Sequence, residues 1–115
     1  MALVVYGIPT CGTVRKARAW MDARGLEHEF VDLRVTPPQR EQVARWVAAF
    51  GARALINTSG GSYRALGPER EGWDEARWVE AFQQDPMLIK RPVVERDGAP
   101  LGVGFHEASA AQRFG

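Results

Sequence analysis

The only cysteine of the chain, Cys11, stands where a short hydrophobic run gives way to a helical pattern. Residues 2–6 form that run, and Gly7 and Pro9 separate it from the helical pattern. A thiol at a helix start lies at the positive end of the helix dipole, beside backbone N–H groups without partners, and both favour the thiolate. The thiolate is the reactive form, so chemistry is sought first at Cys11. The alternative is a buried, inert cysteine, which is the usual fate of a single thiol.

Basic side chains follow the cysteine on the polar face of the predicted helix. They are Arg15, Lys16, Arg18 and Arg24. Their charge could attract an anionic substrate to Cys11, or they could form an ordinary solvated face, which is the commoner case.

A strand, a helix and a second strand must position the cysteine. Apolar residues recur at the helical spacing i, i+3 and i+7, and Thr10 is the candidate N-cap. Gly25 followed by Leu26 is typical of a helix stop. Residues 28–33 alternate between polar and apolar side chains, which predicts a strand that begins at His28. Such a βαβ unit has parallel strands and a right-handed crossover, and His28 is expected at the surface rather than in catalysis.

The middle of the chain is predicted to be mainly helical. Thr36 is the candidate N-cap of a helix that begins with two prolines and ends at Gly51. A short helix is expected at 54–56, followed by a polar, glycine-rich loop at 57–62 whose N–H groups could hold an anion. Asp74 is the candidate N-cap of a further helix that extends to about residue 84.

The last third of the chain predicts a hairpin and a short helix. A strand opens at Val93, Asp97 and Gly98 form a tight turn, and a second strand is expected over 101–105. A helix is expected over about 107–114. The resulting order is βαβ, a helical block, and ββα, with four strands in one mixed sheet.

Composition narrows the class of protein. The 115 residues suit one domain, and the net charge of +1 gives no reason to expect nucleic acid or a membrane as partner. No apolar stretch approaches the length of about 20 residues that spans a bilayer. The N-terminus resembles no signal peptide, and a single cysteine forms neither an internal disulfide nor a cysteine-rich metal site. A cytoplasmic monomer without a metal ion is expected.

Three segments, in order along the chain, resemble signatures of a known family. They are YGIPTCGT at 6–13, LIKRPVV at 88–94 and GVGF at 102–105. In these segments the chain is similar to the arsenate-reductase-like proteins (the ArsC, Spx and YffB family), and the resemblance covers nearly the whole length. It implies a thioredoxin-like α/β fold: a mixed four-stranded sheet in one domain, 1–115, with a helical subdomain inserted at about 37–84.

The resemblance also implies an active site. Cys11 would be the nucleophile, and Arg91 would stabilise its thiolate and bind an oxyanion or a carboxylate of glutathione. Pro92 corresponds to the family's cis-proline, which faces the active site. Further candidate residues for binding the substrate or the thiol are Thr10, Gly12, Thr13, Arg15 and Asn57.

Departures from the family's patterns leave three functions open. Arginines that hold the oxyanion in arsenate reductases of this type are replaced by Asn57-Thr58 and Gly104-Phe105, and a histidine four residues before the cysteine is replaced by Gly7. Each hydrogen bond to a charged group contributes about 1.5–3 kcal/mol, so arsenate should bind weakly. The first alternative function is therefore a weak arsenate reductase.

The second alternative is an Spx-like transcription regulator that binds RNA polymerase. Regulators of that type usually carry a Cys-x-x-Cys switch, and here the second position is Val14. The YffB-like branch, with one cysteine, matches best. We therefore expect a glutathione-dependent thiol/disulfide reductase without a bound cofactor. Glutathione or a similar small thiol would be its co-substrate, an oxidised molecule its substrate, and glutaredoxin a candidate partner.

Overall fold

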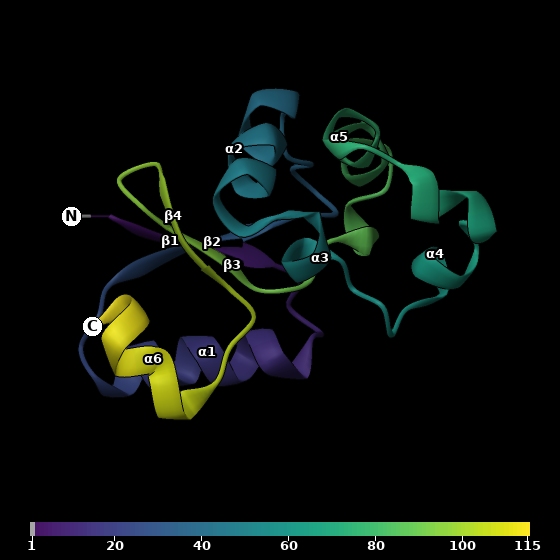
Figure 1. The fold of residues 1–115 in the computed structure, drawn as a ribbon. Coiled ribbons are helices and arrows are strands. Elements are labelled where there is room, and N and C mark those ends of the chain that lie inside the picture. The colour runs from purple at the N-terminus through teal and green to yellow at the C-terminus, as the bar shows by residue number, and fades with distance from the viewer. Residues whose placement is uncertain (1) are drawn as a thin grey trace. The chain divides into compact units, whose positions relative to one another are not determined.

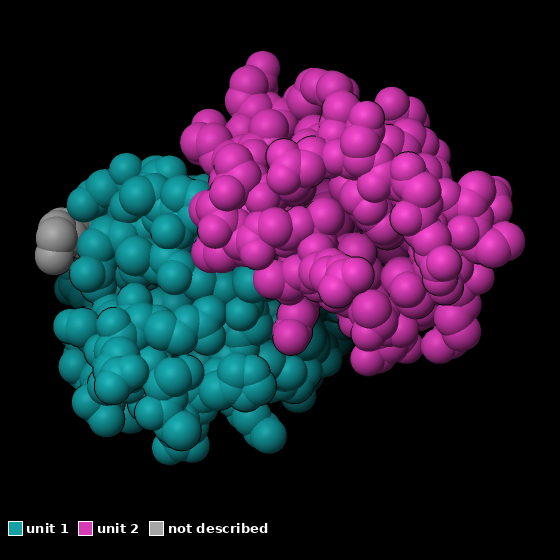
Figure 2. All heavy atoms as spheres, in the orientation of Figure 1, with its two compact units in different colours: residues 1–36, 91–115 teal, residues 37–90 magenta. Residues whose placement is uncertain are grey.

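The computed structural model describes residues 2–115. The chain divides into two compact units, which Figure 2 colours separately. One combines the segment up to Thr36 with Arg91–Gly115, and the other is Pro37–Lys90. One domain with an insertion at about 37–84 stays a prediction. Each unit is described by itself.

The first unit is built on a mixed four-stranded sheet in the order β2-β1-β3-β4 (Figure 1). β1 pairs with β2 in parallel and with β3 antiparallel, and β3 pairs antiparallel with β4. This arrangement confirms the predicted βαβ…ββα sheet. The strands are β1 (Leu3–Gly7), β2 (His28–Asp32), β3 (Val93–Arg96) and β4 (Ala99–Val103).

Two helices, α1 (Gly12–Ala23) and α6 (Glu107–Phe114), lie along the same face of the sheet (Figure 1). Alternate residues of β1 point to this face, because successive side chains of a strand point to opposite sides. They meet apolar residues that recur at helical spacing on the two helices. The buried cluster is made of Leu3, Val5, Val14, Trp20, Met21, Val94, Ala110 and Phe114.

The start of α1 differs from the prediction by one residue. Cys11, not Thr10, is the N-cap, with an extended backbone (φ −77°, ψ 123°). The reason is a turn before the helix, in which the N–H of Cys11 donates to the carbonyl of Ile8 (3.2 Å). The first helical bond then runs from the N–H of Arg15 to the carbonyl of Cys11 (3.0 Å).

The end of α1 confirms the predicted helix stop. Gly25 has a φ of +67°, a left-handed conformation that glycine adopts without the clash a Cβ would cause. The N–H of Leu26 donates to the carbonyl of Met21 (2.9 Å), and that of Gly25 to the carbonyl of Asp22 (3.1 Å). These two bonds form a Schellman motif, and Leu26 packs against the core cluster.

The hairpin is confirmed, although its second strand begins earlier than predicted. Asp97 (φ 52°) and Gly98 (φ 81°) form the two-residue turn, and Arg96 pairs directly with Ala99. Because a two-residue turn places its flanking residues in register, β4 starts at Ala99 rather than at residue 101.

The second unit is helical. Its α-helices are α2 (Arg40–Phe50), α3 (Ala52–Leu55), α4 (Gly61–Arg64) and α5 (Glu75–Gln84), and its 3-10 helices are Pro68–Gly72 and Pro86–Leu88. The Asp74 cap is confirmed, since its side chain accepts a hydrogen bond from the N–H of Arg77 (2.9 Å). The predicted Thr36 cap is wrong: α2 begins after Gln39, because Pro37 itself precedes a proline and is therefore disfavoured in helical conformation. The predicted 57–62 loop likewise gives way to α4 at Gly61. Across the described residues, no helix is both long and apolar enough to cross a membrane.

Candidate active site

The Cys11 loop and the Arg91-Pro92 segment lie at the same end of the sheet in the first unit. β1 and β3 are antiparallel, and Tyr6 near the end of β1 pairs with Val93 at the start of β3. Cys11 follows β1 by four residues, and Arg91 and Pro92 directly precede β3. The pairing of these strands thus brings together two segments that are 80 residues apart in sequence.

Pro92 connects this end of the sheet to a third segment. The Arg91–Pro92 peptide bond is cis, and Pro92 is buried. Its carbonyl accepts a hydrogen bond from the N–H of Gly104 (2.8 Å), and Gly104 has a φ of +76° that favours glycine. Arg91 is half-buried. Its role beside the thiolate stays a prediction.

Cys11 is half-buried and packs against the core cluster, while the start of the helix around it is open. No side chain caps this helix end, and the first turn of α1 holds no acidic residue. Thr10, Gly12 and Thr13 are all exposed. The first N–H groups of a helix have no partner inside it, and together with the helix dipole they form a general anion-binding arrangement. The open helix start can therefore hold a thiolate or a bound anion.

Arg15 is fixed one helical turn beyond the cysteine. Its Nε donates to the carbonyl of Pro9 (3.0 Å), and the side chain is otherwise exposed. Residues four apart lie on the same side of a helix, so Arg15 follows Cys11 on its face of α1. The arrangement suits the predicted role of Arg15 in binding an anionic group.

The packing of Val14 against Gly7 explains why position 7 carries no side chain. A Cβ at Gly7 would lie 2.6 Å from Cγ2 of Val14, which is closer than real Cβ atoms come. Val14 is only 1% exposed. These are the positions where the resemblance expects a histidine and, in Spx-type proteins, a second cysteine. With valine at position 14, position 7 has room for glycine only.

Packing also explains the first glycine of the GVGF segment, Gly102. The guanidinium of Arg113 lies against Gly102, so that a Cβ there would collide with it. Arg113 donates to the carbonyl of Val103 (3.0 Å) and lies 5.0 Å from the ring of Phe114. Burial lowers the pKa of Arg113 below its ordinary value. The first glycine of the signature therefore leaves room for an arginine of α6.

Asn57 belongs to the second unit. Its side-chain oxygen accepts a hydrogen bond from the N–H of Ser59 (3.3 Å), and its own N–H donates to the carbonyl of Leu88 (2.7 Å). It holds the start of the glycine-rich loop in place. A part for Asn57 in binding stays a prediction.

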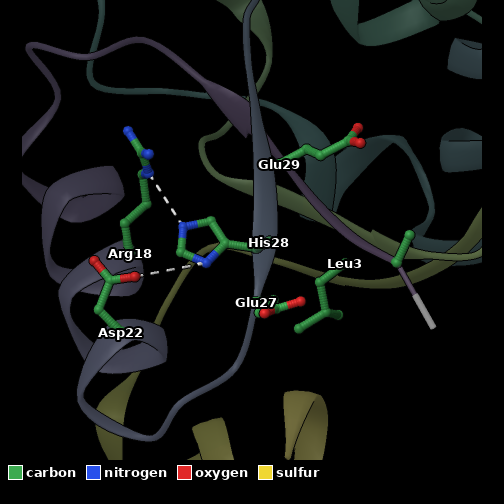
Figure 3. Close-up of a pocket in the computed structure, with 7 residues that line it drawn as sticks. Leu3, Arg18, Asp22, Glu27, His28 and Glu29 are labelled. Carbon is green, nitrogen blue, oxygen red and sulfur yellow. Dashed lines mark hydrogen bonds and ion pairs between the residues drawn. The ribbon is translucent and has the colours of Figure 1, made fainter.

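The side chain of His28 lies in a different environment from the one that the sequence predicted. It begins β2 as predicted, but its side chain is only 4% exposed, so the expected surface position is wrong. Its Nε2 accepts a hydrogen bond from Nε of Arg18 (3.2 Å; Figure 3). Its Nδ1 lies 3.1 Å from the carbonyl of Leu26. These partners fit a neutral imidazole with its proton on Nδ1. Nothing in the spacing of the two residues along the chain indicated this contact.

The surroundings of His28 are charged and partly hollow. A pocket of about 570 Å³ is lined by Arg18, Asp22, Glu27, His28 and Glu29, together with Leu3 of β1 and Ala2 just before it (Figure 3). Asp22 lies 4.0 Å from Nδ1 of His28. No group of three His, Cys, Asp or Glu side chains suited to a metal ion occurs among residues 2–115.

The comparisons with known sequences agree on one family. The model of the ArsC family matches residues 6–112. The uncharacterized protein YusI of Bacillus subtilis (strain 168) is 35% identical over 111 residues, which cover 93% of each chain. The arsenate reductase of Escherichia coli (strain K12) is 30% identical over 102 residues, which cover 87% of this chain and 70% of the reductase.

Solved structures extend the similarity to the whole fold. The YffB (PA3664) protein matches with a TM-score of 0.87 and 35% identity, over 98% of this chain and 99% of that one. A possible arsenate reductase from Streptococcus mutans UA159 matches with a TM-score of 0.86 and 30% identity, over 97% and 98% of the two chains. These matches confirm the predicted thioredoxin-like α/β fold.

Proposed function

The chain belongs to the ArsC family, and from this premise we propose that it is a thiol-dependent oxidoreductase with Cys11 as its nucleophile. The observation that carries the proposal is the position of Cys11 at an uncapped helix start with exposed neighbours. Unpaired N–H groups and the helix dipole favour the thiolate there, and the thiolate is the form that attacks sulfur.

The proposed reaction is a thiol–disulfide exchange. The thiolate of Cys11 attacks one sulfur of a disulfide substrate, a mixed disulfide forms, and the other sulfur leaves as a thiolate. An external thiolate then attacks the substrate sulfur of the mixed disulfide, and Cys11 leaves as a thiolate. The external thiol and the substrate become joined by a new disulfide, which a second thiol molecule cleaves. Each step exchanges one S–S bond for another, so electrons balance.

An external thiol is required because the chain has one cysteine and so cannot resolve the mixed disulfide itself. Glutathione is the proposed co-substrate, with glutaredoxin as a candidate partner and the cytoplasm as a compartment that keeps such thiols reduced. Arg91 is proposed to stabilise the thiolate and to bind a carboxylate, since a guanidinium pairs with carboxylates in a forked geometry. Thr10, Gly12, Thr13 and Pro92 would form the backbone surface against which the thiol lies.

Mass spectrometry after exposure to oxidised glutathione tests the proposal. The wild type should gain the mass of one glutathionyl group, and reduced glutathione should remove it. The matched control is Cys11→Ser, which keeps the size of the side chain and should gain no mass. A wild type that stays unmodified under excess oxidised glutathione would contradict the proposal.

Arsenate reduction is the second candidate, because relatives over most of the chain bear the name arsenate reductase. The replaced oxyanion arginines lead us to expect slow turnover at most. Arsenite formation, assayed with glutathione and glutaredoxin for the wild type and Cys11→Ser, decides between the candidates. Cysteine-dependent turnover faster than exchange with a small disulfide would make arsenate the better substrate.

A further inference from the structure

A smaller pocket lies on the face of α1 that begins at the cysteine. Its volume is about 340 Å³, and we call it the α1 pocket; it is lined by Pro9, Val14, Arg15, Arg18, Ala19 and Asp22. Counted from Cys11, the helical members stand at i+3, i+4, i+7, i+8 and i+11. Positions with this spacing share one side of a helix. The α1 pocket therefore starts about one turn beyond the thiol, on the same face.

Two arginines in the α1 pocket are held in place by their Nε atoms. Nε of Arg15 donates to the carbonyl of Pro9 (3.0 Å), and Nε of Arg18 donates to His28 (3.2 Å). The guanidinium of Arg18 also lies 4.5 Å from the centre of the Phe30 ring. A guanidinium anchored through Nε still has its two terminal NH₂ groups to form a forked pair with a carboxylate. The arginines are thus ordered before any ligand arrives, which lowers the entropy lost on binding.

A carboxylate completes the lining. Asp22 stands one turn beyond Arg18, with its side chain 75% exposed and pointing toward the side of His28 (Figure 3). A simple oxyanion such as arsenate or phosphate would be repelled by Asp22. A group that carries both a carboxylate and an ammonium satisfies the arginines and Asp22 together. The charges therefore suit the head group of an α-amino acid.

The distance from Cys11 suits a short peptide. A helix rises 1.5 Å per residue, which places Arg15 about 6 Å and Arg18 about 10 Å along the axis from Cys11. An extended peptide spans at most about 3.3–3.6 Å per residue, so the backbone of a tripeptide reaches about 5 Å from its central residue to either end. The side chain of the central cysteine, and that of a residue linked through its γ-carboxylate, lengthen this arm, and the arginine side chains lean along the helix toward its N-terminus and so toward Cys11. A tripeptide bound to Cys11 through its central sulfur can therefore place one end in the α1 pocket.

We propose that the α1 pocket binds the γ-glutamyl head group of glutathione during its reaction with Cys11. Arg15 and Arg18 hold the α-carboxylate, Asp22 holds the α-ammonium, and His28 positions Arg18. The inference rests on the proposed function and deepens it, because it assigns the selectivity for the thiol to one face of α1. It predicts a preference for zwitterionic peptide disulfides over neutral ones.

The test measures a ratio of two rate constants for mixed-disulfide formation at Cys11. One disulfide is oxidised glutathione, and the other is the uncharged hydroxyethyl disulfide; in both reactions the attacked S–S bond breaks and one thiolate leaves. Because the same thiolate attacks both probes, the ratio cancels any change in the nucleophilicity of Cys11. Mass spectrometry of quenched samples gives both rate constants.

The decisive variant is the double substitution R15Q/R18Q, which removes both charges while keeping most of each side-chain stem. We expect the ratio of glutathione to hydroxyethyl rates to fall about tenfold or more, and D22N to lower it by about two- to fivefold. The matched control is K16Q, which removes one exposed charge of the same helix outside the pocket and should leave the ratio within about twofold. An unchanged ratio in R15Q/R18Q, or an equal fall in K16Q, would overturn the inference.

Two further measurements keep the outcomes separate. Circular dichroism checks that each variant is folded; if R18Q is not, R15Q alone carries the test, since Arg15 is exposed and should lower the ratio by about threefold or more. A wild type that reacts with neither disulfide would overturn the proposed function and this inference with it. A wild type that reacts with hydroxyethyl disulfide while showing no preference for glutathione would overturn the inference alone.

Discussion

The helices α1 and α5 begin in opposite ways. At α5 the side chain of Asp74 accepts a hydrogen bond from the N–H of Arg77, and Glu75 adds a negative charge in the first turn. At α1 the N-cap is Cys11, no side chain accepts such a bond, and the first turn contains no acidic residue. An N-cap carboxylate typically contributes about 1 kcal/mol. The helices α2 and α6 also lack a side-chain cap, but each has a glutamate in its first turn, whereas α1, which carries the thiol, has neither.

The comparison indicates which negative groups an open helix start can stabilise. The positive end of a helix dipole stabilises whichever negative group is nearest, within the first turn. In α5 that group is the carboxylate of Asp74, and the interaction stabilises the fold. In α1 the positive end of the helix remains available to stabilise the thiolate of Cys11 and an anionic ligand. The following predictions test this difference, from the largest expected effect to the smallest.

Replacing Cys11 with aspartate should abolish the reaction with oxidised glutathione and at the same time stabilise the fold. The carboxylate can cap α1 as Asp74 caps α5, for a gain of about 0.5–1 kcal/mol, or roughly 2–6 °C in Tm. Thermal unfolding followed by circular dichroism measures it. The control is Cys11→Ala, which removes the thiol and adds no acceptor. A Tm of Cys11→Asp at or below that of Cys11→Ala would mean that α1 is not open to capping.

Substituting Gly7 with alanine should destabilise the first unit by about 1–3 kcal/mol, because the new Cβ would collide with Val14. Val14→Ala should remove the collision, so the double variant should be more stable than the sum of the single effects predicts. Denaturant unfolding of the four proteins gives this coupling energy. Strict additivity would show that Gly7 is required for another reason.

Removing the cap of α5 should have a smaller effect, confined to stability. Asp74→Ala should cost about 1 kcal/mol in denaturant unfolding, while Asp74→Asn, which keeps an acceptor, should cost less. The rate of glutathionylation at Cys11 should stay within about twofold in both variants. A cost for Asp74→Asn as large as that for Asp74→Ala would show that the hydrogen bond is not what stabilises this helix start.

Thr10→Ala should have the smallest effect, below about 0.5 kcal/mol. Thr10 is exposed and precedes the N-cap, so its hydroxyl is not required to cap α1. Denaturant unfolding measures the change. A loss near 1 kcal/mol would restore Thr10 as the cap that the sequence favours.

The order of strands and helices was predictable because each is encoded locally. Alternation, helical spacing, the Gly25 stop, the Asp74 cap and the Asp97-Gly98 turn all depend on neighbours within a few residues. The errors fall at element boundaries. Thr10 and Thr36 have the right chemistry for N-caps, but a turn before one and the prolines after the other shift the helix start.

The contacts that assemble the candidate site could not be predicted from local sequence patterns. Burial of His28 depends on Arg18, ten residues earlier, and the close approach of Gly7 to Val14 depends on how α1 packs on the sheet. The placement of Arg91 and Pro92 at the cysteine's end of the sheet follows from strand pairing across the whole chain. The family resemblance anticipated these segments because it draws on complete folds rather than on spacing.

The rate of alkylation of Cys11 by iodoacetamide at neutral pH, compared between Thr13→Asp and Thr13→Asn, tests the central claim most directly. Only the thiolate reacts, so the rate follows the fraction ionised. The aspartate places a negative charge in the first turn of α1, which holds none in the wild type. If the open start of α1 stabilises the thiolate, Thr13→Asp should react about two- to fivefold more slowly than Thr13→Asn, because its carboxylate competes for the positive end of the helix. Equal rates in the two variants would contradict the account.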